Sequence, residues 1–151
     1  MQKMSYSNIY LKNPYKQYDY VSDSLSNTDN SFLSAAAKIA QTSNYKYRMA
    51  ALLVKSGRVL GGDVNVPRIT PDTPPKRCST HAEIRVLKNV KNTLGSTIYI
   101  ARLLLDDTIA IAKPCVWCLE SIINSDVSRV VFTCNDNTSD SFYTNMISWN
   151  H

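Results

Sequence analysis

The chain has 151 residues, of which 44% are hydrophobic and 19% are charged. This length predicts one domain with a core large enough to fold alone, and the composition is ordinary for a soluble globular protein. No apolar run approaches the roughly 20 residues of a membrane-spanning helix, and Met1 to Tyr20 lack the apolar stretch of a secretory signal. We therefore expect a cytoplasmic protein whose four cysteines are metal ligands or buried thiols rather than disulfides.

The formal net charge of +5 is distributed unevenly, because basic residues are in excess before Asp106 and acidic residues after it. Five basic residues cluster in the middle of the sequence: Lys76, Arg77, Arg85, Lys88 and Lys91. A solvated helix face explains them most simply, whereas a positive field would attract phosphorylated or polymeric substrates. The charge pattern therefore excludes neither a nucleotide nor a nucleic acid as partner.

The first 30 residues are polar and rich in Tyr and Asn, without a helix or strand period. We predict a loosely ordered arm over residues 1–30, followed by one domain over residues 31–151. The domain is predicted to begin with a helix over Phe32 to Gln41, because residues 33, 36, 37 and 40 form an apolar stripe behind the candidate capping residues Asp29, Asn30 and Ser31.

A tight antiparallel hairpin is predicted next. The strand Met49 to Lys55 is followed by Ser56-Gly57 and then by the strand Arg58 to Val64. Because the first of these strands is apolar almost throughout, we expect it to be covered on both faces.

The remaining chain alternates loops, helices and strands. A Pro-rich loop over residues 66–79 cannot be a regular element, and a second loop covers residues 106–113. Helices are predicted from His81 to Lys91, from Pro114 to about Asn124 and, as a short terminal piece, from Phe142 to Ile147, with strands over residues 97–104 and 130–134. Helices between successive strands require crossovers, so we predict an α/β protein with a mixed β-sheet and helices on both faces.

Two short motifs carry the chemistry. His81 and Glu83 stand at the start of one predicted helix, and Pro114, Cys115 and Cys118 at the start of another. One imidazole and two thiolates are a donor set for Zn²⁺ that leaves a fourth position open for water. Cysteines at i and i+3 of a helix point the same way, and a helix N-terminus favours the thiolate. Glu83 is then available for proton transfer without being a ligand.

His-Ala-Glu followed by Pro-Cys-Val-Trp-Cys resembles the signature of the zinc-dependent cytidine and deoxycytidylate deaminase superfamily, in particular its small microbial and viral members. The resemblance covers about Arg48 to Cys134. It implies a cytidine-deaminase-like three-layer fold and hydrolytic deamination of a cytosine-containing nucleoside or nucleotide, with release of ammonia. It also implies His81, Cys115 and Cys118 as zinc ligands and Glu83 as proton shuttle.

Three substrate contacts and an assembly are implied by the same resemblance. Asn65 at the end of the second strand would hold the sugar, although an Asn there is also an ordinary turn residue. The backbone N–H of Ala82 would hold the base carbonyl, and the backbone carbonyl of Pro114 would accept from the exocyclic amine. Relatives are commonly homo-oligomers.

Other functions remain open at this point. A deaminase acting on single-stranded DNA or tRNA would use the basic N-terminal part of the chain and its tyrosines. A non-catalytic zinc-binding module would leave Glu83 without a purpose, and Cys78 is its candidate extra ligand. A thiol–disulfide oxidoreductase built on Cys115 and Cys118 would leave His81 and Glu83 unexplained.

Overall fold

A computed structural model of the protein describes residues 17–67 and 79–150. In chain order its elements are β1 (Gln17–Tyr20), α2 (Asn27–Ala40), β2 (Arg48–Lys55), β3 (Arg58–Val64), β4 (Val66–Pro67), β5 (Ser79–Thr80), α3 (Ala82–Asn89), β6 (Thr97–Leu103), β7 (Ile109–Ala110), α4 (Val116–Asn124), β8 (Arg129–Thr133), β9 (Ser139–Tyr143), a 3₁₀ turn (Thr144–Met146) and β10 (Ile147–Asn150). None of the helices in these described ranges has the length and apolar character needed to cross a bilayer.

A central sheet carries the fold. Its strand order is β3-β2-β6-β8-β9, with the short β7 beside β6. Strands β6 and β8 are parallel and are joined through α4, whereas β2 is antiparallel to both β3 and β6. Strands β3 and β6 therefore run in the same direction, joined through α3. The predicted mixed sheet with crossover helices is confirmed.

The predicted hairpin between β2 and β3 is also confirmed, with Lys55 paired to Arg58 across the turn. Ser56 and Gly57 have φ angles of 52° and 74°. Two successive residues in the left-handed region form the type of turn whose twist matches that of the flanking strands. A Cβ on Gly57 would meet nothing within 4 Å, so the glycine serves the backbone angle and not a close contact.

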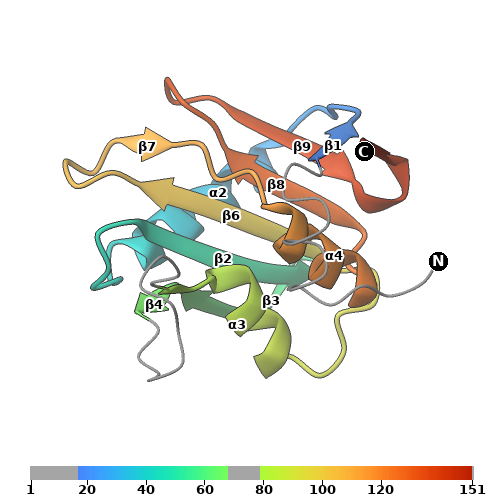
Figure 1. Ribbon diagram of the computed structural model, residues 1–151, viewed down its shortest axis with the longest axis horizontal. Coiled ribbons are helices and arrows are strands. Elements are labelled where there is room, and N and C mark those ends of the chain that lie inside the picture. The colour runs from blue at the N-terminus through green and yellow to red at the C-terminus, as the bar shows by residue number, and fades with distance from the viewer. Residues whose placement is uncertain (1–16, 68–78, 151) are drawn as a thin grey trace.

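Helices cover both faces of the sheet, as predicted (Figure 1). Along β2, Leu52 and Val54 pack in the cluster under α2, and the alternate residues Ala51 and Leu53 pack in the cluster under α3 and α4. Two glycines in the edge strand β3 allow side chains of the helix layers to approach the strand closely. A Cβ on Gly61 would lie 2.9 Å from Val90 Cγ2, after α3, and one on Gly62 would lie 3.3 Å from Ile39 Cδ1 of α2.

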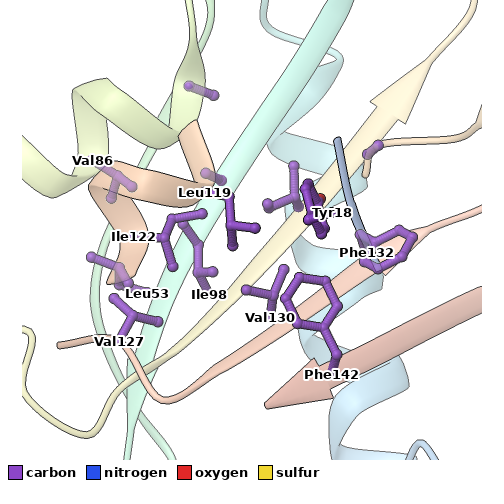
Figure 2. Packing of buried hydrophobic residues seen from close by; sticks show 14 residues of the cluster. Tyr18, Leu53, Val86, Ile98, Leu119, Ile122, Val127, Val130, Phe132 and Phe142 are labelled. Carbon is purple, nitrogen blue, oxygen red and sulfur yellow. The ribbon is translucent and has the colours of Figure 1, made fainter. Parts of the chain in front are cut away.

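The larger apolar cluster lies between the sheet and the α3–α4 layer (Figure 2). It joins Val86 of α3 and Leu119 of α4 to residues of the central strands and, at one end, to Tyr18. Its largest buried members are Phe132, Phe142, Leu53, Ile98, Ile100, Leu119 and Ile122. Burial of each such side chain contributes about 1.5–3 kcal/mol, so this cluster anchors the two helices that bear the zinc motifs.

The N-terminal part differs from the sequence prediction. The predicted boundary at residue 30 is wrong for residues 17–30, because β1 pairs with β10 and α2 begins at Asn27 rather than Phe32. Ser26 and Asp29 form a reciprocal capping box that starts the helix one turn earlier. The part of the predicted arm over residues 1–16 lies outside the described residues.

The predicted terminal helix over Phe142 to Ile147 is wrong. This segment contains the end of β9, a 3₁₀ turn and the start of β10. Strand β9 pairs antiparallel with β8, and Phe142 points into the core while Tyr143 is exposed. Alternation with a period of two is the strand pattern, and a short apolar run does not by itself distinguish it from one helical turn.

The two ends of the predicted Pro-rich loop meet. Strands β4 and β5 pair antiparallel, with Val66 opposite Thr80. This pairing brings the end of β3 next to the start of α3, so that Asn65 and His81 lie near the same edge of the sheet. The intervening residues 68–78, with Cys78 and the basic Lys76 and Arg77, lie outside the described residues.

Candidate metal centre and active site

The two motifs meet where α3 and α4 begin. His81 is the capping residue of α3 and Cys115 that of α4, both with extended backbone angles. Neither side chain makes the hydrogen bond to its own helix that a Ser or Asp would make at this position. Both side chains are therefore available for another partner, at helix ends that carry partial positive charge.

Three potential ligands converge there. His81 Nδ1 lies 3.1 Å from Cys118 Sγ and 3.8 Å from Cys115 Sγ, and the three ligand atoms all lie within 4.8 Å of one another. Bonds of about 2.0 Å to nitrogen and 2.3 Å to sulfur around one tetrahedral zinc require separations of this order. The donor set and its spacing fit a zinc ion.

The two thiols of the centre have opposite pKa shifts, and Cys115 favours the thiolate. The pKa of the Cys115 thiol is lowered by hydrogen bonds with Cys118 and with His81, whereas hydrogen bonding to Cys115 and burial raise the pKa of Cys118. Two sulfurs in contact cannot both ionise easily without a cation, so the pair shares a proton that a metal would displace. The hydrogen bond with Cys115 likewise raises the pKa of His81, against the effect of burial.

Glu83 is the second residue of α3 and lies almost completely inside the protein, with 1% of its surface exposed. Burial raises the pKa of its carboxyl group. Its Oε1 atom has no hydrogen-bond partner in the described part of the chain, which is unusual for a buried polar atom. A carboxyl group that is buried, beside His81 and Cys118, and short of a partner is suited to receive and pass on protons.

The three predicted substrate-contact residues differ in their burial and in the hydrogen bonds that they already make. Ala82 is fully buried as the first residue of α3. The backbone carbonyl of Pro114 accepts a hydrogen bond of 2.6 Å from the hydroxyl of Tyr18. Both residues adjoin the metal centre in sequence, since Ala82 follows His81 and Pro114 precedes Cys115.

Asn65 is buried at the end of β3 and its side-chain amide is engaged within the protein. Its Oδ1 accepts from the Met49 N–H at 2.9 Å and from the Ser43 hydroxyl at 3.0 Å, and its Nδ2 donates to the Tyr47 carbonyl. This amide ties the loop before β2 to the end of β3. Within the described residues Nδ2 makes this one hydrogen bond, so its second N–H is available to another acceptor.

Tyr18 is the residue near this centre that sequence reasoning missed. Its alternation with Tyr20 in Gln-Tyr-Asp-Tyr is a strand signal, with Gln17 and Asp19 exposed and Tyr18 buried. Four residues are too few to establish a strand from sequence, and the partner strand β10 lies about 130 residues later along the chain.

Comparison with known proteins agrees with this geometry. The family model described as the cytidine and deoxycytidylate deaminase zinc-binding region matches residues 26–134. The chain belongs to this family. Since the family region is zinc-binding and His81, Cys115 and Cys118 are positioned to hold a metal, the metal of this deaminase centre is zinc. No curated protein sequence matches the chain.

Solved structures share its fold. The dCMP deaminase from the cyanophage S-TIM5 in apo form has a TM-score of 0.56 and 19% identity, over 76% of this chain and 88% of that chain. The same phage enzyme in complex with dCMP and dUMP has a TM-score of 0.57 and 20% identity, over 75% and 85%. The cytidine deaminase from Burkholderia pseudomallei has a TM-score of 0.59 and 15% identity, over 80% and 94%. The predicted cytidine-deaminase-like three-layer fold is confirmed.

Proposed function

We propose that the protein hydrolyses the exocyclic amine of a cytosine-containing nucleoside or nucleotide, giving the uracil product and ammonia. One observation carries this proposal: the buried carboxyl group of Glu83, whose Oε1 atom has no hydrogen-bond partner in the described part of the chain, stands beside a convergent His81, Cys115 and Cys118. A zinc site that served stability alone would have no need of that carboxyl group. The similar phage enzyme, which binds dCMP and dUMP, supports a pyrimidine nucleotide as substrate.

The proposed roles divide between metal and proton transfer. His81, Cys115 and Cys118 would hold zinc, which when bound acts as a Lewis acid that lowers the pKa of a water molecule to about 7. Glu83 would accept one proton of the attacking water and pass it to the ring nitrogen of the base, and would then carry the second proton, from the newly added hydroxyl, to the amino group, which departs as ammonia. Water supplies the new carbonyl oxygen, so that base and water on one side balance product and ammonia on the other.

Substrate binding would use the backbone beside these residues. The N–H of Ala82 would donate to the base carbonyl, and the Pro114 carbonyl would accept from the exocyclic amine. Because Ala82 is fully buried and Pro114 is buried too, both contacts would be made away from bulk water, where a hydrogen bond is electrostatically stronger.

The sugar contact of Asn65 can be separated from its structural role. Asn65→Ala should weaken the binding of a nucleoside more than the binding of the free base, because only the nucleoside carries the sugar. Ser43→Ala is the matched control, since it removes one hydrogen bond to the Asn65 amide and leaves the amide in place. Steady-state KM values for cytidine and cytosine measure the difference. An equal loss on both substrates for Asn65→Ala would refute the sugar contact.

A second candidate substrate is a single-stranded nucleic acid. Tyr47 is half exposed at the same edge of the sheet as Asn65, and Lys46 Nζ and the Arg102 guanidinium lie 5.2 and 5.6 Å from the centre of its ring. Exposed aromatic rings beside basic groups are typical of single-strand binding. This surface favours the alternative without requiring it.

One assay panel separates the candidates. Ammonia release would be measured on cytosine, cytidine, deoxycytidine, deoxycytidylate, adenosine and short single strands, with zinc quantified in the same preparation. Turnover of a free cytosine nucleoside or nucleotide at one zinc per chain supports the proposal. Turnover confined to single strands would replace it with the nucleic-acid alternative, and bound zinc without any turnover would indicate a non-catalytic module.

A further inference from the structure

The two ends of the described chain, both outside the family match, combine into one ribbon. Strand β1 pairs antiparallel with β10, and Tyr18 stands opposite Trp149 in the register. The family match begins at residue 26 and ends at residue 134. The ribbon therefore lies outside the part of the chain that the family model covers.

The ribbon is fixed to the protein by aromatic packing. Tyr18 is 4% exposed, and its ring centre lies 5.8 Å from that of Trp149 and 6.0 Å from that of Phe142. Tyr20 packs on Phe142 with ring centres 4.9 Å apart. Figure 2 shows Tyr18 toward the same end of the main core cluster as Phe132 and Phe142. A ring held on several sides has a well-defined position, and so has its hydroxyl group.

The hydroxyl of Tyr18 reaches the segment that leads into the metal centre. It donates to the Pro114 carbonyl at 2.6 Å, and Lys113 Nζ lies 4.5 Å from the centre of the same ring. The Pro114 carbonyl belongs to the peptide bond that continues into Cys115. Tyr18 thus contacts the main chain just before the first thiol of the centre.

A purely structural role does not explain this hydroxyl. Phe would fill the same apolar site without the cost of burying a polar group, and one intramolecular hydrogen bond contributes only about 1 kcal/mol net. The bond instead fixes the direction of one carbonyl. A carbonyl oxygen has two lone pairs, so a second donor can bind beside the hydroxyl.

We propose that Tyr18 is a positioning residue for deamination, which aims the Pro114 carbonyl at the exocyclic amine of the substrate. The inference rests on the proposed function, in which that carbonyl accepts from the amine. Without the hydroxyl, the Pro114–Cys115 peptide loses its lateral support, and the carbonyl must be oriented when the substrate binds. Ligands that carry the amine should therefore bind more weakly when the hydroxyl is removed, and ligands without the amine should bind as before.

The test compares two ligands in the zinc-loaded, full-length protein. Tyr18→Phe keeps the ring and removes only the hydroxyl. We expect the KM for cytidine or deoxycytidylate, whichever the wild type uses, to rise about 5- to 20-fold, the range that corresponds to one oriented hydrogen bond. The inhibition constant of a pyrimidin-2-one nucleoside, which lacks the amine, should change less than twofold.

Tyr20→Phe is the matched control on the same ribbon. It removes a hydroxyl that donates to Asp140 Oδ2 at 2.8 Å, away from the Pro114 carbonyl. This variant should keep the wild-type KM. Zinc content and melting temperature of both variants show whether the fold and the centre are preserved.

Two results would overturn the proposal. One is an unchanged KM in Tyr18→Phe. The other is an equal loss of binding for the cytosine substrate and for the amine-free nucleoside, which would indicate a structural role alone. Failure of the proposed function is a separate result, because it would appear as absence of turnover in the wild-type protein.

Discussion

Two buried carboxylates, on opposite faces of the same sheet, have opposite environments. Asp29 of α2 is 4% exposed and Glu83 of α3 is 1% exposed. Asp29 is fully partnered, whereas one oxygen of Glu83 has no partner in the described part of the chain. The comparison separates a carboxylate that stabilises the fold from one that is left for a substrate or water.

Asp29 is the centre of a charged network. Arg129 donates to both of its oxygens at 2.8 and 2.9 Å, Tyr99 donates its hydroxyl proton at 2.7 Å, and the Ser26 N–H donates at 2.9 Å. Burial by itself would raise the pKa of Asp29, but these hydrogen bonds and the Arg129 charge lower it to about 2. The ionised form therefore contributes to stability at neutral pH.

Glu83 has no such support. No basic side chain pairs with it among the described residues, and burial raises the pKa of its carboxyl group. A protein retains a buried carboxyl group with an unpaired oxygen at a cost to its stability. The difference between the two sites agrees with the proposed proton-transfer role of Glu83 and with a structural role of Asp29.

The largest expected effect is that of Glu83→Gln. We expect deamination to fall by about 10²- to 10⁴-fold, the usual contribution of general acid–base catalysis, because an amide cannot shuttle a proton. Zinc content should stay at the wild-type level, since Glu83 is not in the ligand set. Ammonia release and metal analysis on one preparation measure both. Loss of zinc together with retained activity would contradict the assignment.

Removal of a thiol should abolish metal binding. Cys118→Ala leaves two of the three converging ligands, so we expect loss of stoichiometric zinc and of the stability that zinc adds by binding only the folded state. A chelator should then lower the melting temperature of the wild type and leave that of the variant unchanged. Cys134→Ala, outside the ligand set, is the control. Wild-type zinc content in Cys118→Ala would refute the role.

Asp29→Ala should act on the fold alone. It leaves the buried Arg129 guanidinium without its main partner, and breaking a buried ion pair in this way costs about 3–5 kcal/mol. Urea denaturation measures the free energy of unfolding. Activity per folded molecule should equal that of the wild type, because α2 lies on the opposite face from the metal centre (Figure 1). A loss of turnover per folded molecule would contradict a purely structural role of Asp29.

Acid should reveal the smaller contribution of the Asp29 charge. Its pKa is lowered from 3.8 to about 2, so the unfolded chain binds the proton more readily between these values. The stabilisation is present above about pH 4 and is lost as the pH falls toward 2. Melting temperatures of the wild type should therefore drop more steeply from pH 4 to pH 2 than those of Asp29→Asn. Parallel curves would show that Asp29 does not contribute.

Local patterns predicted the central part of the fold well. The Ser56-Gly57 turn, the apolar strand β2 and the two zinc motifs at helix starts are all encoded within a few residues. Periodicity and turn chemistry act over that range, so a single sequence carries them. The prediction failed at the ends, where a short apolar run near Phe142 was assigned to a helix and the β1 residues to an arm.

The sequence by itself determined the donor set and its chemistry, because an imidazole, two thiols and a carboxyl group at fixed spacings have few other uses. Only the tertiary structure decided which groups surround them. Tyr18 meets Pro114 across 96 positions of the chain, and Asp29 meets Arg129 across 100. Pairings at such separations depend on how the sheet stacks its strands and helices, and no local pattern specifies them.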